Sequence, residues 1–178
     1  GLAGQAWAVP PGFDLFETEP TTTRFNFSEE FTIPAGFFDP GCGSFTGVVR
    51  FKGVPVGAFM GQPTGTADTV VERKAAAELP APFHSSDTIP IELVQLSLTS
   101  TQPITVTCGT ATQIWDVTVT LSPSRPSTGT MTITKLDATG GTFDSKLPVF
   151  PLFKFTRHSD LAVRVLDVGA LVLPDESI

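Results

Sequence analysis

Residues 114–121 read IWDVTVTL, and from Trp115 onward an apolar side chain alternates with a polar one. Successive side chains of a β-strand point to opposite faces of the sheet, so this period of two puts one face in a core and the other in solvent. An α-helix, with its 3.6 residues per turn, would scatter the same apolar residues around its circumference. The stretch therefore predicts an amphipathic β-strand with Trp115, Val117, Val119 and Leu121 on the buried face.

The same alternation continues on both sides of this stretch. A turn rich in serine and proline separates it from residues 130–136, and we expect the two segments to pair as a hairpin. The other strands that the pattern predicts lie at 24–33, 45–52, 91–98, 104–108, 152–157, 161–168 and 171–173. Turn residues break these runs at intervals of about 8–15 residues, which is typical of β-sandwiches and barrels.

Two segments depart from the simple pattern. In 91–98 the apolar parity switches between Leu93 and Val94, which predicts a β-bulge or a strand buried on both faces. Residues 69–79 begin with a β-branched run and continue with good helix formers. For this segment we expect a strand that runs into one helical turn before Pro80.

The composition agrees with an all-β chain. Its 178 residues are 40% hydrophobic, which is enough apolar material for the core of a single domain. Only 16% are charged, while glycine and proline contribute 16 residues each, and this balance favours strands and turns over helices with charged faces. We therefore expect one domain over residues 24–178, an antiparallel β-sandwich that is either immunoglobulin-like or jelly-roll-like.

Residues 1–23 differ from the rest, because they hold three prolines and one dense apolar cluster, Phe13, Leu15 and Phe16. Proline disfavours a helix here, so we expect an extended N-terminal arm. Such an arm can add a strand to the sheet of a neighbouring copy, its aromatic side chains filling pockets there. Repeated head to tail, that contact builds a filament. In the alternative interpretation, the arm folds back onto its own domain.

The two cysteines, Cys42 and Cys108, are well placed for a disulfide. Cys108 ends an alternating run on the face that carries Ile104 and Val106, and Cys42 lies in a glycine-flanked turn that can approach a strand closely. The bridge would close a loop of about 65 residues and contribute about 4 kcal/mol in the chain-entropy model. Two buried thiols are the alternative. A disulfide indicates export, so we expect a secreted or cell-surface protein.

The net charge of −7 argues against some partners. An acidic chain repels phosphate backbones and anionic headgroups, so we expect no nucleic-acid partner. No run approaches the roughly 18 apolar residues that cross a bilayer, so we expect no transmembrane segment.

Candidates for catalysis are few. His84 and His158 each have a hydroxyl and a carboxylate nearby in sequence, but adjacency in a loop does not orient a nucleophile and its base. Glu29 and Glu30 are neighbours in a predicted strand, so they point to opposite faces and are poorly placed for glycoside hydrolysis. We expect a protein that is not an enzyme and carries no organic cofactor.

The best metal candidate is calcium, because an acidic exported domain offers oxygen ligands and few nitrogen or thiolate ligands. Asp137 and Asp144 begin and end a turn-like segment that could supply carboxylates. The segment lacks the ligand density of an EF-hand loop, and a plain hairpin turn is the alternative interpretation.

Two surfaces suggest binding. Trp7 or Trp115 could stack on a sugar ring, although Trp115 shares its face with aliphatic residues and is favoured for the core. The threonine rows at 118/120 and 130/132/134 would form a hydroxyl-bearing face for sugar, ice or mineral if their strands pair.

These observations predict an extracellular, non-enzymatic structural or adhesive protein that self-associates into a filament or matrix through its arm. A carbohydrate-binding module for cell-surface glycans is the first alternative, and a secreted hydrolase is the second.

Overall fold

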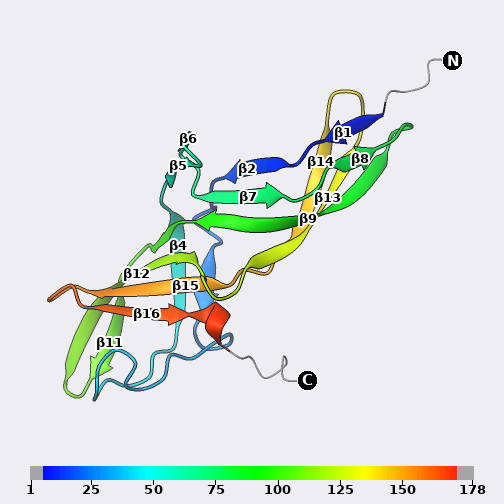
Figure 1. Ribbon diagram of the computed structural model, residues 1–178. Helices are drawn as coiled ribbons and strands as arrows, with labels where there is room; N and C mark the ends of the chain where they lie inside the picture. The colour runs from blue at the N-terminus through cyan, green and yellow to red at the C-terminus, as the bar shows by residue number, and fades with distance from the viewer. Residues whose placement is uncertain (1–5, 172–178) are drawn as a thin grey trace.

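The computed structural model describes residues 6–171, which are built almost entirely of β-strands (Figure 1). The strands form two larger antiparallel sheets and two short two-stranded ones. The predicted all-β, antiparallel, sandwich-like fold is confirmed. Figure 1 shows the five-stranded sheet toward the end of the molecule where the chain begins, and the seven-stranded sheet toward the end where β11 lies.

The seven-stranded sheet has the order β16-β15-β12-β10-β4-β3, and β11 pairs with β12 off this path. Its strands are β3 (Arg24–Asn26), β4 (Val48–Gly53), β10 (Leu98–Ser100), β11 (Ile104–Cys108), β12 (Ala111–Leu121), β15 (Pro151–Arg157) and β16 (Val163–Asp167). The strand predicted at the outset is β12, and its register with β15 sets Val117 opposite Phe155. A single 3-10 turn, η1 (Val168–Ala170), follows β16.

The five-stranded sheet has the order β14-β13-β9-β7-β2. Its strands are β2 (Gly12–Phe16), β7 (Thr69–Arg73), β9 (Ser85–Leu96), β13 (Ser127–Lys135) and β14 (Gly141–Lys146). The remaining strands pair as β1 (Trp7–Val9) with β8 (Ala77–Leu79), and β5 (Gly57–Phe59) with β6 (Gln62–Gly65). Thus β2 and β14 are the two edges of this sheet.

One hydrophobic cluster contains buried residues of both sheets. At its centre Trp115, Phe27, Phe38 and Phe155 are completely buried. The ring of Phe38 lies 5.1 Å from that of Trp115 and 5.2 Å from that of Phe155, centroid to centroid. The Phe38–Phe155 contact is edge-to-face and the Phe38–Trp115 contact is tilted. Aromatic pairs of this kind add to the free energy that burial alone provides.

The predicted hairpin of residues 114–121 with 130–136 is wrong. β12 pairs with β10, β11 and β15, whereas β13 pairs with β9 and β14 in the other sheet. In the connection between the two sheets, the buried hydroxyl of Ser122 accepts hydrogen bonds from the backbone N–H groups of Ser124 and Arg125. The threonine rows of the two strands consequently do not share one face. The threonines of β13 lie beside residues of β9 instead, and the hydroxyls of Thr132 and Thr88 are hydrogen-bonded at 2.7 Å.

The parity switch in β9 marks a real irregularity. Val70 of β7 lies opposite Gln95, but Val71 lies opposite Leu93, so Val94 is the extra residue of a β-bulge. The prediction of a bulge at this position is confirmed. A bulge of this kind bends its strand and increases the local twist.

The helical turn expected before Pro80 is absent from the described chain, where the segment forms β7 and β8. Burial of Val70, Val71, Ala77 and Leu79 outweighs the helix propensity of the residues between them. Other predicted strands differ in length. The segment at 24–33 shortens to β3 followed by a turn, and the segment at 45–52 shifts to β4. Of the strand expected at 171–173, residues 172 and 173 lie outside the described residues.

Candidate functional site

The two edges of the five-stranded sheet border one groove of about 400 Å³. β2 pairs only with β7, and β14 pairs only with β13, so each edge has one side without a strand partner in the described chain. The sheet curls until the rings of Phe16 and Phe143 lie 6.0 Å apart across the opening. The lining residues are Val9, Asp14, Leu15, Phe16, Arg73, Leu79, Met131, Ile133, Thr134, Lys135, Gly140, Gly141, Thr142 and Phe143.

The three apolar residues of the arm all lie in β2, which pairs with β7 of the same chain. Phe13 contacts the ring of Phe59 at 5.1 Å, and Phe16 contacts Phe143. Leu15 remains 48% exposed. No residue of the arm from 6 to 16 is fully buried. The arm therefore lies at the outside of the core, and only Val9 and Phe16 of its described residues pack partly against the core cluster.

A polar contact fixes the arm against β7. Arg73 Nη1 donates to Asp14 Oδ1 at 2.9 Å, and both side chains line the groove. The side chain of Arg73 is only 17% exposed, and its buried Nε atom has no hydrogen-bond partner. This ion pair selects the position of β2 along β7, because a shift of the arm would leave the guanidinium without its carboxylate.

The segment after β2, residues 17–23, is held by a buried carboxylate that the sequence did not single out. Asp68 is 3% exposed, and it accepts hydrogen bonds from the backbone N–H of Thr18 at 2.8 Å and from its hydroxyl at 2.6 Å. The hydroxyl of Thr69 donates to the same carboxylate at 2.6 Å. Gly53 is required beside it, because a Cβ there would collide with the Asp68 carboxylate. Nothing local in the sequence around Asp68 signals this role.

The opposite edge, β14, is exposed along all six residues. Phe143 is 58% exposed, an unusual position for a large aromatic side chain. Asp144 and Lys146 lie two residues apart on the strand, so both are on the face opposite to that of Phe143. Asp144, a calcium candidate, lies opposite Thr132 of β13, well separated along the hairpin from Asp137.

Asp137 serves the turn between β13 and β14. Its carboxylate accepts hydrogen bonds from the backbone N–H groups of Thr139 and Gly140 and from the Thr139 hydroxyl. The Thr139 bonds in particular lower the pKa of Asp137. Among residues 6–171 there is no group of three acidic, histidine or cysteine side chains that could hold a metal ion.

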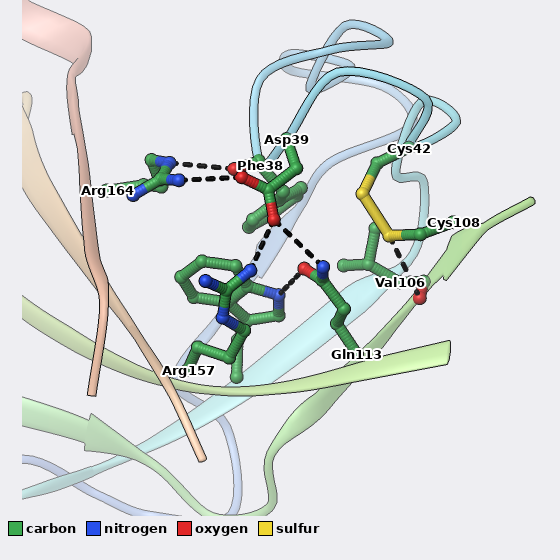
Figure 2. Close-up of a disulfide and its surroundings, with 9 residues drawn as sticks. Phe38, Asp39, Cys42, Val106, Cys108, Gln113, Arg157 and Arg164 are labelled. Atoms are coloured by element: carbon green, nitrogen blue, oxygen red, sulfur yellow. Dashed lines mark hydrogen bonds and ion pairs between the residues drawn. A yellow bond between two sulfur atoms is a disulfide. The ribbon is translucent and has the colours of Figure 1, made fainter. Parts of the chain in front are cut away.

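The disulfide between Cys42 and Cys108 is formed, as predicted (Figure 2). Beside it, Asp39 accepts hydrogen bonds from Gln113 at 2.9 Å, from Arg164 at 2.8 Å and from Arg157. The bond from Gln113, followed by those from the two arginines, lowers the pKa of Asp39. The bridge and the ion cluster together attach the loop between β3 and β4 to the seven-stranded sheet, so their role is structural.

Neither tryptophan presents an open stacking surface. Trp115 is completely buried, and its indole N–H donates to Gln113 at 3.2 Å. Trp7 is 43% exposed, but Lys135 Nζ lies over its ring at 4.0 Å. A sugar that stacks on this face of Trp7 would have to displace the cation.

The histidines do not assemble a catalytic group within the described chain. His158 Nε2 lies 2.9 Å from Asp116 Oδ1 at an exposed position, and no hydroxyl or thiol of residues 6–171 bonds to this histidine. His84 lies exposed in the loop before β9. The described residues also include no helix long and apolar enough to span a membrane.

Comparison of the chain with protein-family models, with curated proteins and with solved structures finds no significant match. The two sheet edges and the groove between them are therefore the features of the described chain from which a function is inferred.

Proposed function

We propose that this chain is an exported, non-enzymatic structural or adhesive protein that self-associates by exchanging its N-terminal arm between copies. The observation that carries the proposal is the position of the arm, an edge strand with exposed aromatic and aliphatic residues and no fully buried side chain. An edge strand can detach without dismantling the core, and the vacated β7 edge then accepts an identical strand from a neighbour.

The contacts of the exchanged arm would be those of the arm in its own chain. Five residue pairs join β2 to β7, three join β1 to β8, and the pair of Asp14 with Arg73 fixes the register. Main-chain bonds of this kind provide affinity, and alternate side chains provide specificity. Head-to-tail exchange builds a filament when the rotation between successive copies does not close a ring.

Export is supported by the disulfide, which joins cysteines 66 positions apart. Disulfides persist in oxidising compartments and are rare in the reducing cytosol. A carbohydrate-binding module is less well supported, since Trp115 belongs to the core and Trp7 is covered by Lys135. A hydrolase is less well supported too, since neither histidine has an oriented nucleophile among residues 6–171.

Cysteine cross-linking tests the exchange directly. Ala8 lies opposite Glu78 in the β1–β8 pair. One protein carries Ala8→Cys and the other Glu78→Cys, and the two are refolded together and oxidised. A disulfide between residues 8 and 78 of different chains is expected, because a chain with only one added cysteine cannot form it alone.

The matched control replaces the second variant with Ser124→Cys, an exposed residue outside both pairs of strands. Mass spectrometry should find no 8–124 link. Electron microscopy of the full chain should show filaments that disappear when residues 1–16 are deleted. A chain that carries both Ala8→Cys and Glu78→Cys is also oxidised, to show that the bridge can form at all. The proposal is wrong if this chain forms its 8–78 bridge only within itself and the mixture of the two single variants forms none.

A further inference from the structure

The register of the β13–β14 hairpin shows which main-chain groups of β14 point toward β13 and which point toward its unpaired edge. The hydrogen bond from Leu136 N–H to the Gly140 carbonyl, 3.1 Å, marks residues 136 and 140 as a hydrogen-bonded pair of the β13–β14 hairpin. Hydrogen-bonded and non-hydrogen-bonded pairs alternate in an antiparallel ladder. Residues 142, 144 and 146 therefore direct their main-chain groups toward β13. Phe143, Ser145 and Leu147 direct theirs toward the open edge.

The charged side chains of β14 are complementary to those of a second, antiparallel copy of the same strand. Asp144 and Lys146 lie on one face, one residue on either side of Ser145. Neither takes part in any ion pair found among residues 6–171. If a second β14 lies antiparallel with its Ser145 opposite Ser145, each Asp144 faces the Lys146 of the other strand. The two opposite-charge pairs would occupy non-hydrogen-bonded positions, where side chains approach most closely.

The same register also brings together apolar side chains on the opposite face of the strand and the outward main-chain groups. Phe143 would lie opposite Leu147 of the second strand, which covers part of an aromatic ring that is 58% exposed in the single chain. The outward main-chain groups of 143, 145 and 147 would then meet one another in register. If the two-fold axis between the strands lay at Phe143 instead, Asp144 would lie opposite Thr142 and Lys146 opposite Gly140. That register contains no pair of opposite charges.

We propose that two copies of this chain associate by antiparallel pairing of β14 with β14 about a two-fold axis at Ser145. The contact is isologous, so it closes after two copies and joins two five-stranded sheets into one continuous sheet. It goes beyond the exchange of the arm and does not depend on it, because it uses the opposite edge of the sheet. Where the arm also builds filaments, this contact joins two filaments side by side.

Charge reversal tests the register. Asp144→Lys sets lysine against lysine across the dyad, and Lys146→Asp sets aspartate against aspartate. Each variant is expected to weaken dimer formation by about tenfold in sedimentation velocity, since two attractive cross-strand pairs become repulsive. The double variant carrying both changes restores opposite-charge pairs and should restore association. Restored association of the double variant would show that the two charges pair with each other, because a general effect of surface charge would not be reversed by the second change. The inference fails if the double variant is as weak as the single ones.

Cross-linking tests the dyad itself. Ser145→Cys should be linked to its own counterpart by a short bis-maleimide, because the two positions face each other. Thr142→Cys, exposed on the same strand, is the control, since two copies of residue 142 would be about 20 Å apart in this register. Equal cross-linking of both variants would overturn the register.

Failure of this contact is distinguishable from failure of arm exchange. If deletion of residues 1–16 abolishes all association and the charge variants change nothing, the β14 pairing is wrong and the exchange remains. If the full chain stays monomeric in sedimentation at every concentration, both are wrong.

Discussion

Single side chains determine how this fold responds to acid. Arg157 binds Asp160 through two hydrogen bonds of 2.8 Å and also binds Asp39. The bonds from Arg157, with that from the Ala162 N–H, lower the pKa of Asp160 to about 2. In the unfolded chain an aspartate titrates at about 3.9. The folded state thus favours the ionised form, which stabilises the fold above pH 4 and loses that contribution as the pH falls toward 2.

We expect Asp160→Asn to lower the free energy of unfolding at pH 7 and to flatten its dependence on pH between about 4 and 2. Urea unfolding at pH 7, 4 and 2.5, followed by circular dichroism, measures both effects. Glu29→Gln, which removes a charge from an exposed position, is the control. A variant that loses stability equally at every pH would contradict this assignment.

Among the elements, the β13–β14 hairpin contains one glycine in a crowded position and one in an open position. A Cβ at Gly129 would collide with the Lys146 carbonyl oxygen and lie 2.9 Å from Leu147 Cα, because β14 ends directly against β13 there. A Cβ at Gly140, in the turn, would meet nothing within 4 Å. Substitutions at the two positions therefore distinguish the effect of crowding from the general effect of replacing a glycine in a strand or turn.

Gly129→Ala is expected to destabilise the protein by about 1–3 kcal/mol, the usual cost of overpacking. Hydrogen exchange should show the main-chain amides of β14 losing protection first, since the collision is with the end of that strand. Gly140→Ala should change the stability much less. Equal effects of the two substitutions would show that the crowding at Gly129 is relieved without loss of pairing.

For the whole molecule, the disulfide is the one covalent link between distant parts of the described chain. It joins the loop before β4 to the end of β11 across 66 positions of sequence. Its main effect in the chain-entropy model is to restrict the unfolded state. Both ends of the bridge belong to the seven-stranded sheet and its β3–β4 loop, whereas the buried hydrophobic cluster contains residues of both sheets.

Replacing both cysteines by alanine is expected to lower the free energy of unfolding by up to about 4 kcal/mol while keeping the β-sheet spectrum. Urea unfolding of the double variant and of the reduced wild-type protein should agree, and a reductant should not affect the variant. A loss below about 1 kcal/mol would show that the unfolded chain is already compact around these positions.

Local chemistry was enough to predict the β-class of the chain, the buried face of β12, the bulge at Val94 and the bridge between Cys42 and Cys108. Alternation, parity and cysteine count are properties of neighbouring residues or of composition, so they can be read without knowing the fold. The pair Asp144 and Lys146 was equally visible in the sequence. Asp144 was interpreted there as the end of a turn-like segment that could supply a calcium ligand, and Lys146 was not singled out, because nothing local shows that β14 ends a sheet.

Strand partners, by contrast, depend on contacts between residues far apart. β12 and β13 have matching patterns and a short turn between them, yet β12 pairs with β15 in one sheet and β13 pairs with β9 in the other. The burial of Asp68 and the meeting of the β2 and β14 edges also arise only when the sheet curls. Each depends on the sum of many long-range contacts, and no single segment of the chain contains that information.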